Sequence, residues 1–331
     1  MRTPEFWRRD GLAARALAPA SWLYGAVAAV RHRTARPVQP PVPVLCVGNL
    51  VAGGAGKTPV ALALGAKLAA RGHAVHFLSR GYGGRERGPL LVDPARHGAD
   101  AVGDEPLLLA RVAPTWVSAD RAAGATAAAE GGAGLIVMDD GHQNATVAKA
   151  CSIVVVDGVY GFGNGRLLPA GPLRETVAAG LARADAVVAV GPDEAGIGAA
   201  IPTGVRASAG RLAPPPDGAG IADRKVVAFA GIARPEKFFA TLRTLGCRIE
   251  HTRAFADHHR YREAEIAVLL QIAASRGAVA VTTAKDAVRL PPALRGAVRV
   301  LDIVFEWNDA AAEEALIAEI EKRTAIASEA G

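Results

Sequence analysis

The sequence is poor in aromatic residues, in lysine and in cysteine, and each shortage excludes a class of protein. Aromatic residues make up 5% of the 331 residues and lysine occurs only seven times, so the chain offers no basic stretch interleaved with aromatic rings of the kind that binds nucleic acid. Cys46, Cys151 and Cys247 are far apart, odd in number and without a CxxC pair, which argues against a structural zinc site or disulfide framework and fits a reducing cytosol. We therefore expect no nucleic-acid partner, despite a net charge of +6.

Apolar content and length indicate a folded protein of two domains. Half of the residues are apolar, which excludes an intrinsically disordered chain because enough surface can be buried to offset the entropy of ordering. With 37 Gly, 21 Pro and no repeating period, the sequence also excludes a coiled coil or a collagen-like helix. At about 100–200 residues per domain, the length corresponds to two domains.

An apolar segment lies near the N-terminus. Residues 11–30 carry a single charge, Arg15, and arginines flank the segment at positions 8, 9, 31 and 33. A membrane span needs about 20 apolar residues, and a proline interrupts the stretch that follows Arg15. Trp7, Trp22 and Tyr24 lie near the ends of the segment, where aromatic rings favour a membrane interface. The segment fits a helix at a membrane surface, and the alternatives are a helix packed on the core, a membrane span or a signal peptide.

The rest of the chain alternates short apolar runs with alanine-rich stretches, a pattern typical of an α/β fold with a parallel sheet. We expect strands at residues 42–47, 75–78, 135–138, 153–156 and 186–190, with a helix over 59–70. After a proline-rich linker at 212–220, strands at 225–230 and 279–283 and a closing helix over 309–325 predict a second α/β unit. The predicted parts are an N-terminal membrane-interface helix (1–35), a P-loop NTPase-like domain (36–212), a linker (213–224) and a smaller α/β domain (225–331).

The strongest local motif is a glycine-rich loop between the first strand and the first helix of the sheet domain. It reads, in order, Gly53, Gly54, Ala55, Gly56, Lys57 and Thr58. Backbone N–H groups of such a loop and the positive end of the following helix bind phosphates, while the lysine reaches the β- and γ-phosphates and the threonine hydroxyl ligates Mg²⁺. Val51 occupies the place of the first glycine of the strict pattern, so the alternative is a glycine-rich turn with an incidental Lys-Thr pair.

Two carboxylates, Asp139 and Asp140, follow the apolar strand at residues 135–138. In phosphoryl-transfer enzymes of this architecture, an acidic residue at such a strand end holds Mg²⁺ or one of its water ligands. Alone, Asp-Asp-Gly is typical of a turn, but together with the phosphate loop it indicates a protein that binds a nucleoside triphosphate. The residues themselves do not identify the acceptor of a phosphoryl group.

Further motifs resemble those of the tetraacyldisaccharide 4′-kinase family of the lipid A pathway. They span nearly the whole chain, and their order is more specific than any one of them. In chain order they lie at residues 6–7, 48–49, 53–59, 79–83, 103–106, 139–143, 162–165, 168–175, 231–235, 257–258 and 285–286.

The resemblance implies a kinase that transfers the γ-phosphate of ATP, with Mg²⁺, to the 4′-hydroxyl of a tetraacyldisaccharide 1-phosphate. It implies work at the cytoplasmic face of the bacterial inner membrane, where a multiply acylated acceptor resides, and it gives the N-terminal segment a peripheral membrane contact. It also adds Asn49, just before the phosphate loop, to the nucleotide site.

The resemblance assigns acid–base roles to residues in both predicted domains. Asp104 is the expected base for the sugar hydroxyl, with a helix N-cap as the alternative. Glu105 is an expected Mg²⁺ ligand in addition to Thr58 and Asp139, with an exposed acid at a helix start as the alternative. His258 is expected to hydrogen-bond the base, although the adjacent His259 and an ordinary surface histidine are alternatives.

Other motif residues are expected to contact the substrates. Arg174 and Glu175 are placed at the catalytic site, with the arginine on phosphate and the glutamate near the metal or the base; an ordinary surface pair is the alternative. Arg80, Tyr82 and Asn164 are predicted to contact the acceptor, and each could instead serve only a turn. The pair at residues 285–286 either binds nucleotide or joins the domains.

Two positions depart from the family pattern, because His142 replaces an apolar or aromatic residue and Ala284 replaces an acidic one. Two other functions are alternatives. A P-loop GTPase or metallochaperone is disfavoured because the residues at 283–286, Thr-Ala-Lys-Asp, have the wrong order for a guanine-binding motif. A membrane-associated nucleotide sensor would need neither Asp104 nor His258. The sequence therefore favours the kinase.

Overall fold

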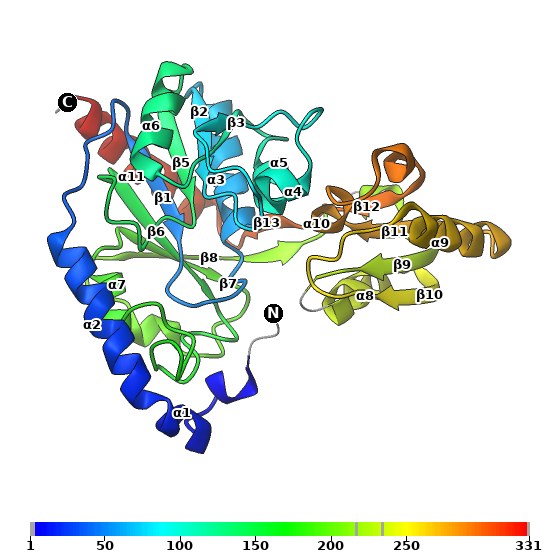
Figure 1. Cartoon of the computed structure of the whole chain (residues 1–331), viewed down its shortest axis with the longest axis horizontal. Coiled ribbons are helices and arrows are strands. Elements are labelled where there is room, and N and C mark those ends of the chain that lie inside the picture. The colour runs from blue at the N-terminus through cyan, green and yellow to red at the C-terminus, as the bar shows by residue number, and fades with distance from the viewer. Residues whose placement is uncertain (1–3, 216–217, 233–234, 330–331) are drawn as a thin grey trace.

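The computed structural model describes residues 4–215, 218–232 and 235–329. Part of the predicted linker (216–217) and two residues of the motif at 231–235 (233–234) lie outside the described residues. Figure 1 shows a large lobe that contains the N-terminal half of the chain and a smaller lobe beside it. The α/β class, the parallel sheet and the second, smaller α/β unit expected from the sequence are confirmed.

A nine-stranded sheet forms the centre of the large lobe, in the order β13-β8-β7-β6-β1-β5-β2-β4-β3. The seven inner strands are parallel, and only the two edge strands, β3 and β13, run antiparallel to their neighbours. In chain order the strands are β1 (Val44–Gly48), β2 (Val75–Ser79), β3 (Leu90–Leu91), β4 (Thr115–Val117), β5 (Leu135–Asp139), β6 (Cys151–Asp157), β7 (Ala186–Val190), β8 (Arg206–Ala213) and β13 (Val304–Trp307).

Helices cover both faces of this sheet, so its central strands are apolar on both sides, as parallel strands require. On one face α3 (Lys57–Ala70) and α11 (Ala310–Glu329) pack against the strands through residues such as Leu64 and Ile317. On the other face lie α6 (Arg121–Glu130) and α7 (Val177–Leu181). The shorter helical elements of this lobe are α4 (Ala99–Val102), α5 (Asp104–Leu109) and η2 (Ile197–Ala200).

The smaller lobe contains a four-stranded parallel sheet in the order β10-β9-β11-β12. Its strands are β9 (Lys225–Ala230), β10 (Arg248–Ala254), β11 (Val279–Thr283) and β12 (Arg299–Leu301). The helices α8 (Pro235–Thr244) and α9 (Glu263–Ser275) cover opposite faces through Phe238 and Ile266. The remaining elements are η3 (Gly218–Gly220), α10 (Ala284–Ala287) and η4 (Pro292–Ala297).

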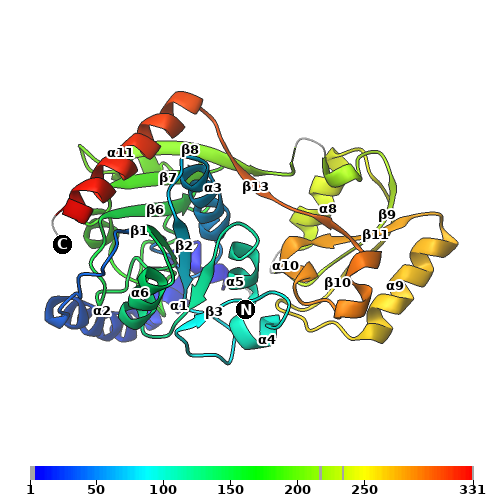
Figure 2. The ribbon, with the colours of Figure 1, turned by 90° about the horizontal axis from the view of Figure 1, so that it is seen from above.

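After the smaller lobe the chain returns to the large one. Strand β13 pairs antiparallel with β8, and the two strands run together between the lobes in Figure 2. Phe305 of β13 and Leu316 and Ile320 of α11 are buried in the core of the large lobe. The predicted range of 225–331 for the smaller domain therefore extends too far, because β13 and α11 bury apolar side chains against the nine-stranded sheet.

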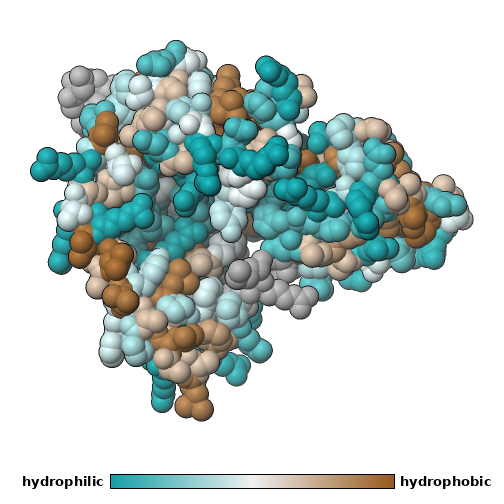
Figure 3. Space-filling model, viewed as in Figure 1, coloured by the Kyte–Doolittle hydropathy of each residue, from teal (hydrophilic) through white to brown (hydrophobic). Residues whose placement is uncertain are grey.

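The N-terminal segment forms η1 (Glu5–Trp7), α1 (Leu12–Ala16) and α2 (Ala18–Thr34). The alternative of a helix packed on the core is wrong, because Ser21 is the only residue of α2 that is buried. Trp22, Leu23, Val27 and Val30 are exposed, and apolar side chains gather along α1 and α2 in Figure 3. Among the described residues, no helix has both the length and the apolar character that crossing a bilayer requires.

Candidate active site

The phosphate loop joins β1 to α3, as the sequence predicts. Gly56 caps α3 with φ +84°, a backbone conformation that favours glycine, and no side chain caps the first N–H groups of the helix. These groups and the helix dipole are therefore available to an anion. Val51, at the place of the missing glycine, is buried and forms a β-bridge with Leu173, which ties the start of the loop to the neighbouring segment.

Thr58 and Asp139 meet at the start of α3 and the end of β5. The Thr58 hydroxyl donates to Asp139 Oδ2 at 2.9 Å, whereas Asp139 Oδ1 is buried without a hydrogen-bond partner among the described residues. Burial raises the pKa of Asp139 to about 7, with a further increase from Asp140 and an opposing effect of Lys57. A hydroxyl oxygen and a carboxylate with an unsatisfied oxygen fit Mg²⁺, which keeps several water ligands and needs few from protein. No larger cluster of metal-ligating side chains is found in the described part of the chain.

Asp140 organises the cationic side chains around the loop. Its φ is +56°, and its carboxylate accepts two hydrogen bonds from Arg174, at 2.8 and 3.2 Å. Lys57 Nζ lies 3.6 Å from Asp140 Oδ1 and donates to Asn49 Oδ1 at 3.2 Å. Burial alone would raise the pKa of Asp140, but Lys57 and Arg174 outweigh it and lower the pKa. Asn49 thus orients the lysine, and Arg174 lies at the site as predicted.

Glu175 does not contact the phosphate loop directly, and Gln143 lies between them. It accepts hydrogen bonds from Gln143 Nε2 at 3.0 Å and from Arg183 Nη2 at 2.6 Å, and it is 8% exposed. Gln143 also donates to the Asn49 carbonyl and accepts from Arg174. Glu175 therefore supports the residues around the loop, whereas the sequence predicted it near the metal or the base. Gln143 belongs to a recognised motif but was not predicted as a site residue, and no motif includes Arg183.

Asp104 and His258 meet between the two lobes. His258 Nδ1 lies 2.8 Å from Asp104 Oδ2, and 154 residues separate the two in the sequence. Asp104 is the first residue of α5 and does not cap it, because the N-cap position belongs to Gly103. The neighbouring His259 pairs with Glu265 at 3.0 Å and does not contact Asp104. The structure thus selects His258 between the two histidines, in agreement with the prediction.

Glu105 forms a second contact between the lobes. Lys285 Nζ donates to Glu105 Oε1 at 2.7 Å, so the pair at residues 285–286 joins the lobes through its lysine. Glu105 also contributes to the raised pKa of Asp139, which places the two carboxylates within electrostatic reach of each other. The structure does not bring Glu105 into contact with Thr58 or Asp139, so its role as a metal ligand stays a prediction.

The turn that carries Arg80 and Tyr82 packs against the start of α5. A Cβ atom at Gly103 would lie 2.5 Å from the carbonyl oxygen of Tyr82, so this close approach requires glycine. Both side chains are exposed, Tyr82 to 74%. The turn therefore presents an arginine and a tyrosine to solvent beside Asp104, where an acceptor could contact them.

Asn164 does not lie with the other predicted site residues. Its Nδ2 donates to the carbonyls of Phe6 and Ala170, and its Oδ1 accepts from the backbone of Arg166. The bond to Phe6 holds the loop before Arg174 against the N-terminal segment, and the other two bonds lie within that loop. The alternative of a turn residue therefore describes Asn164 better than a substrate contact, since its amide is already committed.

The two departures from the family pattern occupy buried positions. His142 Nε2 lies 2.9 Å from the Gly180 carbonyl, and burial lowers the pKa of His142 to about 4, so the ring is neutral at pH 7. A Cβ at Gly48 would lie 2.5 Å from His142 Cβ, which leaves no room for a larger residue in β1 there. Ala284 is buried at the start of α10.

Two buried arginines were not predicted from the sequence. Arg121 begins α6 and is 5% exposed; burial, then the charge of Arg80, lowers the pKa of Arg121 to about 10. Arg289 lies after α10, with its Nε 3.2 Å from Asp104 Oδ2. No sequence signal marks either residue, because both stand outside the motifs.

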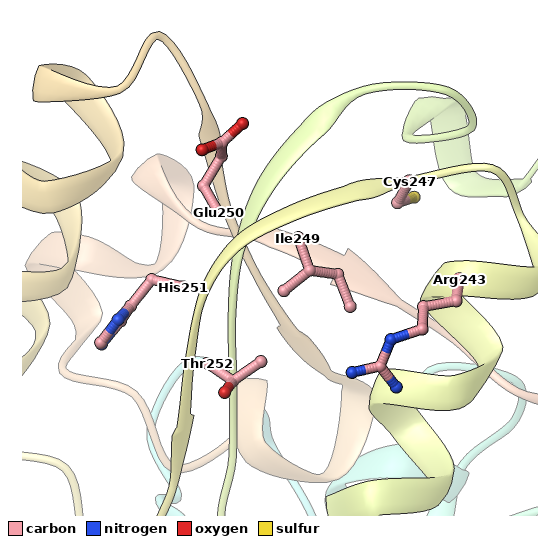
Figure 4. A pocket seen from close by; sticks show the side chains of 6 residues that line it. All are labelled: Arg243, Cys247, Ile249, Glu250, His251 and Thr252. Carbon is pink, nitrogen blue, oxygen red and sulfur yellow. The ribbon is translucent and has the colours of Figure 1, made fainter.

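A hollow of about 570 Å³ lies elsewhere, on the smaller lobe between α8 and β10. In Figure 4, Arg243 of α8 lies across it from Ile249 and Thr252 of β10. None of the predicted site residues lines this hollow. The residues predicted to bind nucleotide and to act in acid–base catalysis are instead grouped at the end of the large sheet and where the lobes meet.

Comparisons with known proteins agree with this arrangement. A family model described as tetraacyldisaccharide-1-P 4′-kinase matches residues 13–321. The tetraacyldisaccharide 4′-kinase of Rhodospirillum rubrum is 57% identical over 323 residues, which is 96% of this chain and 97% of that protein. The one from Paramagnetospirillum magneticum is 54% identical over 309 residues, which is 93% of this chain and 95% of that protein.

A solved structure, LpxK from Aquifex aeolicus in complex with ATP, has the same fold. Its TM-score is 0.75 at 27% identity, and the match covers 93% of this chain and 99% of that one. The family match over nearly the whole chain, together with relatives more than half identical, settles the assignment. The chain belongs to the tetraacyldisaccharide-1-P 4′-kinase family.

Proposed function

We propose that the protein transfers the γ-phosphate of ATP to the 4′-hydroxyl of a tetraacyldisaccharide 1-phosphate in lipid A biosynthesis. The observation that carries the proposal is the contact between Asp104 and His258, which holds a carboxylate where the lobes meet. The proposal gives this carboxylate the role of the base. Helix α5, which begins with Asp104, packs beside α3, which begins at the phosphate loop. A nucleotide site and a base on adjacent helices suit a kinase better than a protein that only binds nucleotide.

The nucleotide end of the reaction uses the uncapped start of α3. The backbone N–H groups of the loop and Lys57 bind the phosphates of ATP, and Asn49 orients the lysine. Thr58 and Asp139 hold Mg²⁺, which when bound neutralises charge that develops on the phosphates. Asp140 restrains Lys57 and Arg174 near the transferred group.

At the acceptor end, Asp104 accepts the proton of the 4′-hydroxyl as the sugar oxygen attacks the γ-phosphorus. The new oxygen–phosphorus bond forms while the bond from the γ-phosphorus to the β-phosphate oxygen breaks, and ADP leaves. His258, hydrogen-bonded to Asp104 Oδ2, fixes the orientation of the carboxylate. Arg80 and Tyr82, exposed beside Asp104, contact the sugar or its phosphate.

The acceptor is a lipid, and α1 and α2 supply the contact with the membrane that holds it. Trp22 is 73% exposed and Leu23 69% exposed, on a helix that buries only Ser21. Arg31 and Arg33, in the last turn of α2, suit anionic headgroups. This arrangement supports a peripheral position at the cytoplasmic face of the inner membrane, where ATP is available.

The test is a phosphoryl-transfer assay with the full-length chain, labelled ATP, Mg²⁺ and the acylated disaccharide 1-phosphate in mixed micelles. We expect a bis-phosphorylated lipid to form in proportion to enzyme. Hydrolysis of ATP without a labelled lipid would refute the proposed acceptor. The unacylated disaccharide is the control, because poor transfer to it would show that the acyl chains contribute to recognition.

A further inference from the structure

Arg289 links the base to the loop that carries His258. Its side chain is 4% exposed, and its Nε lies 3.2 Å from Asp104 Oδ2. Its Nη1 donates to the carbonyls of Gly231 at 3.1 Å and of His259 at 3.3 Å. One guanidinium group therefore contacts both the base and the backbone next to its histidine partner.

Asp286 contacts the Nη1 end of the Arg289 guanidinium, away from Asp104. Asp286 Oδ1 accepts from the Gly231 N–H at 2.9 Å and from the Tyr261 hydroxyl at 2.8 Å, and Arg289 Nη1 lies 3.4 Å from the same oxygen. The other oxygen, Oδ2, accepts from Thr283 at 2.6 Å. Asp286 is fully buried, so this anchor fixes the guanidinium in one place.

Two donor groups of Arg289 lack a hydrogen bond among the described residues. Its Nε and Nη2 are buried and make no hydrogen bond with the described residues. In a guanidinium, the Nε–H and one N–H of Nη2 point from the same edge, and their spacing matches the two oxygens of a carboxylate. The Nε end of this edge is the one nearest Asp104. A buried donor without a partner is costly, so pairing of this edge with the nearby Asp104 carboxylate is favoured.

We propose that Arg289 is a positioning residue for the base Asp104. Its charge and its Nε/Nη2 edge hold the Asp104 carboxylate in the orientation that faces the acceptor. The same guanidinium also donates to the backbone of the loop that contains His258. It therefore holds Asp104 and His258 at a fixed distance from each other where the lobes meet. The inference rests on the proposed function, since it gives Arg289 a role only through Asp104.

Few charged or hydrogen-bonding groups surround the Asp104 carboxylate and could orient it. His258 and Arg289 both approach Oδ2, and the nearby Lys285 is already paired with Glu105. Arg289 is therefore the arginine whose positive charge directly contacts the carboxylate among the described residues. Its burial keeps it from meeting ATP itself.

The test compares three variants of the full-length protein in the lipid transfer assay: Arg289→Ala, Arg289→Lys and the control Arg295→Ala. Arg295 is an exposed arginine of η4 that donates only to backbone carbonyls of Leu290 and Val288. We expect Arg289→Ala to lower kcat by about tenfold to a hundredfold, since a well-placed base contributes about 10²–10⁴-fold. The KM for ATP should stay within about twofold, because Arg289 contacts the base and not the phosphate loop. Arg295→Ala should match the unmodified chain.

Rescue separates a positioning role from a structural one. Arg289→Lys, which keeps the positive charge but lacks the two-donor edge, should recover only part of kcat, and added guanidinium ion should raise kcat of Arg289→Ala in a saturable way. A kcat of Arg289→Ala within twofold of the unmodified chain would overturn the inference. So would a loss that neither lysine nor guanidinium restores, because that pattern reports packing alone. Absence of lipid transfer by the unmodified chain would instead refute the proposed function, and the inference with it.

Discussion

Replacement of Ser21 by alanine is expected to loosen the attachment of α2 to the large lobe. The Ser21 hydroxyl donates to the Leu167 carbonyl at 2.8 Å and accepts from the Ala170 N–H at 3.0 Å. Both partners belong to the loop that leads to Arg174, so one side chain fixes the exposed helix α2 to a segment that ends beside the phosphate loop. Trp7 Nε1, which donates to the Pro169 carbonyl at 3.0 Å, supports the same contact.

The magnitude follows from the groups that would be left unpaired. The Ala170 N–H is buried and would lose its partner, at a cost of about 1–3 kcal/mol, whereas the Leu167 carbonyl is half-buried and can reach water. Alanine is a better helix former than serine and returns about 0.5 kcal/mol. The net loss is about 0.5–2.5 kcal/mol, which corresponds to about 2–70-fold in the equilibrium for local opening.

Hydrogen exchange measures this opening directly. In Ser21→Ala, amide exchange in a peptide covering residues 167–173 is expected to speed up by that factor, whereas exchange in the strands of the sheet stays unchanged. Ser275→Ala is the matched control, because Ser275 is exposed and donates only to a carbonyl of its own helix. Equal exchange in the Ser21 variant and the unmodified chain would refute the reasoning, since the two hydrogen bonds would then contribute nothing to docking.

Three further predictions concern the metal and the membrane. Burial raises the pKa of Asp139 to about 7, and a carboxylate must be ionised to bind a metal. The affinity for MgATP should therefore be constant above pH 7 and fall about tenfold per pH unit below it. A calorimetric titration in which the affinity does not depend on pH would contradict this. Thr58→Val should weaken MgATP binding by about 10–100-fold but leave ATP binding without Mg²⁺ nearly unchanged, and an equal loss in both would argue against a metal ligand. The double change Trp22→Ala and Leu23→Ala should lower partition onto anionic vesicles by about 10–100-fold in a sedimentation assay, whereas Val112→Ala, at an exposed residue elsewhere, should not.

The central strands of the fold could be predicted because they are continuous apolar runs. Strands β7, β9 and β11 have the predicted bounds, and the other predicted strands, such as β1, differ from their predicted bounds by one or two residues at an end. Strand β8 alternates between exposed and buried residues, and its partner β13 lies about a hundred residues later, so neither run stands out locally. The return of α11 to the large lobe depends on that pairing and could not be read from the composition of the C-terminal segment.

The site divides in the same way between local and distant information. Gly56, Lys57 and Thr58 are adjacent, so a short motif contains the geometry of the phosphate loop. Asp104 and His258 are brought together only by the fold, and a family resemblance rather than spacing predicted their contact. Arg289 belongs to no motif. The role that we propose for it depends on its burial between the lobes, and no local sequence pattern encodes that burial.

The most direct test of the account measures lipid phosphorylation and ATP binding together in Asp104→Asn. Asparagine keeps the size of the side chain but cannot accept the hydroxyl proton. The account predicts a loss in kcat of about 10²–10⁴-fold with an unchanged dissociation constant for MgATP, because the base acts on the acceptor alone. Turnover within tenfold of the unmodified chain, or a loss of ATP binding that explains the loss of activity, would contradict the assignment of Asp104 as the base.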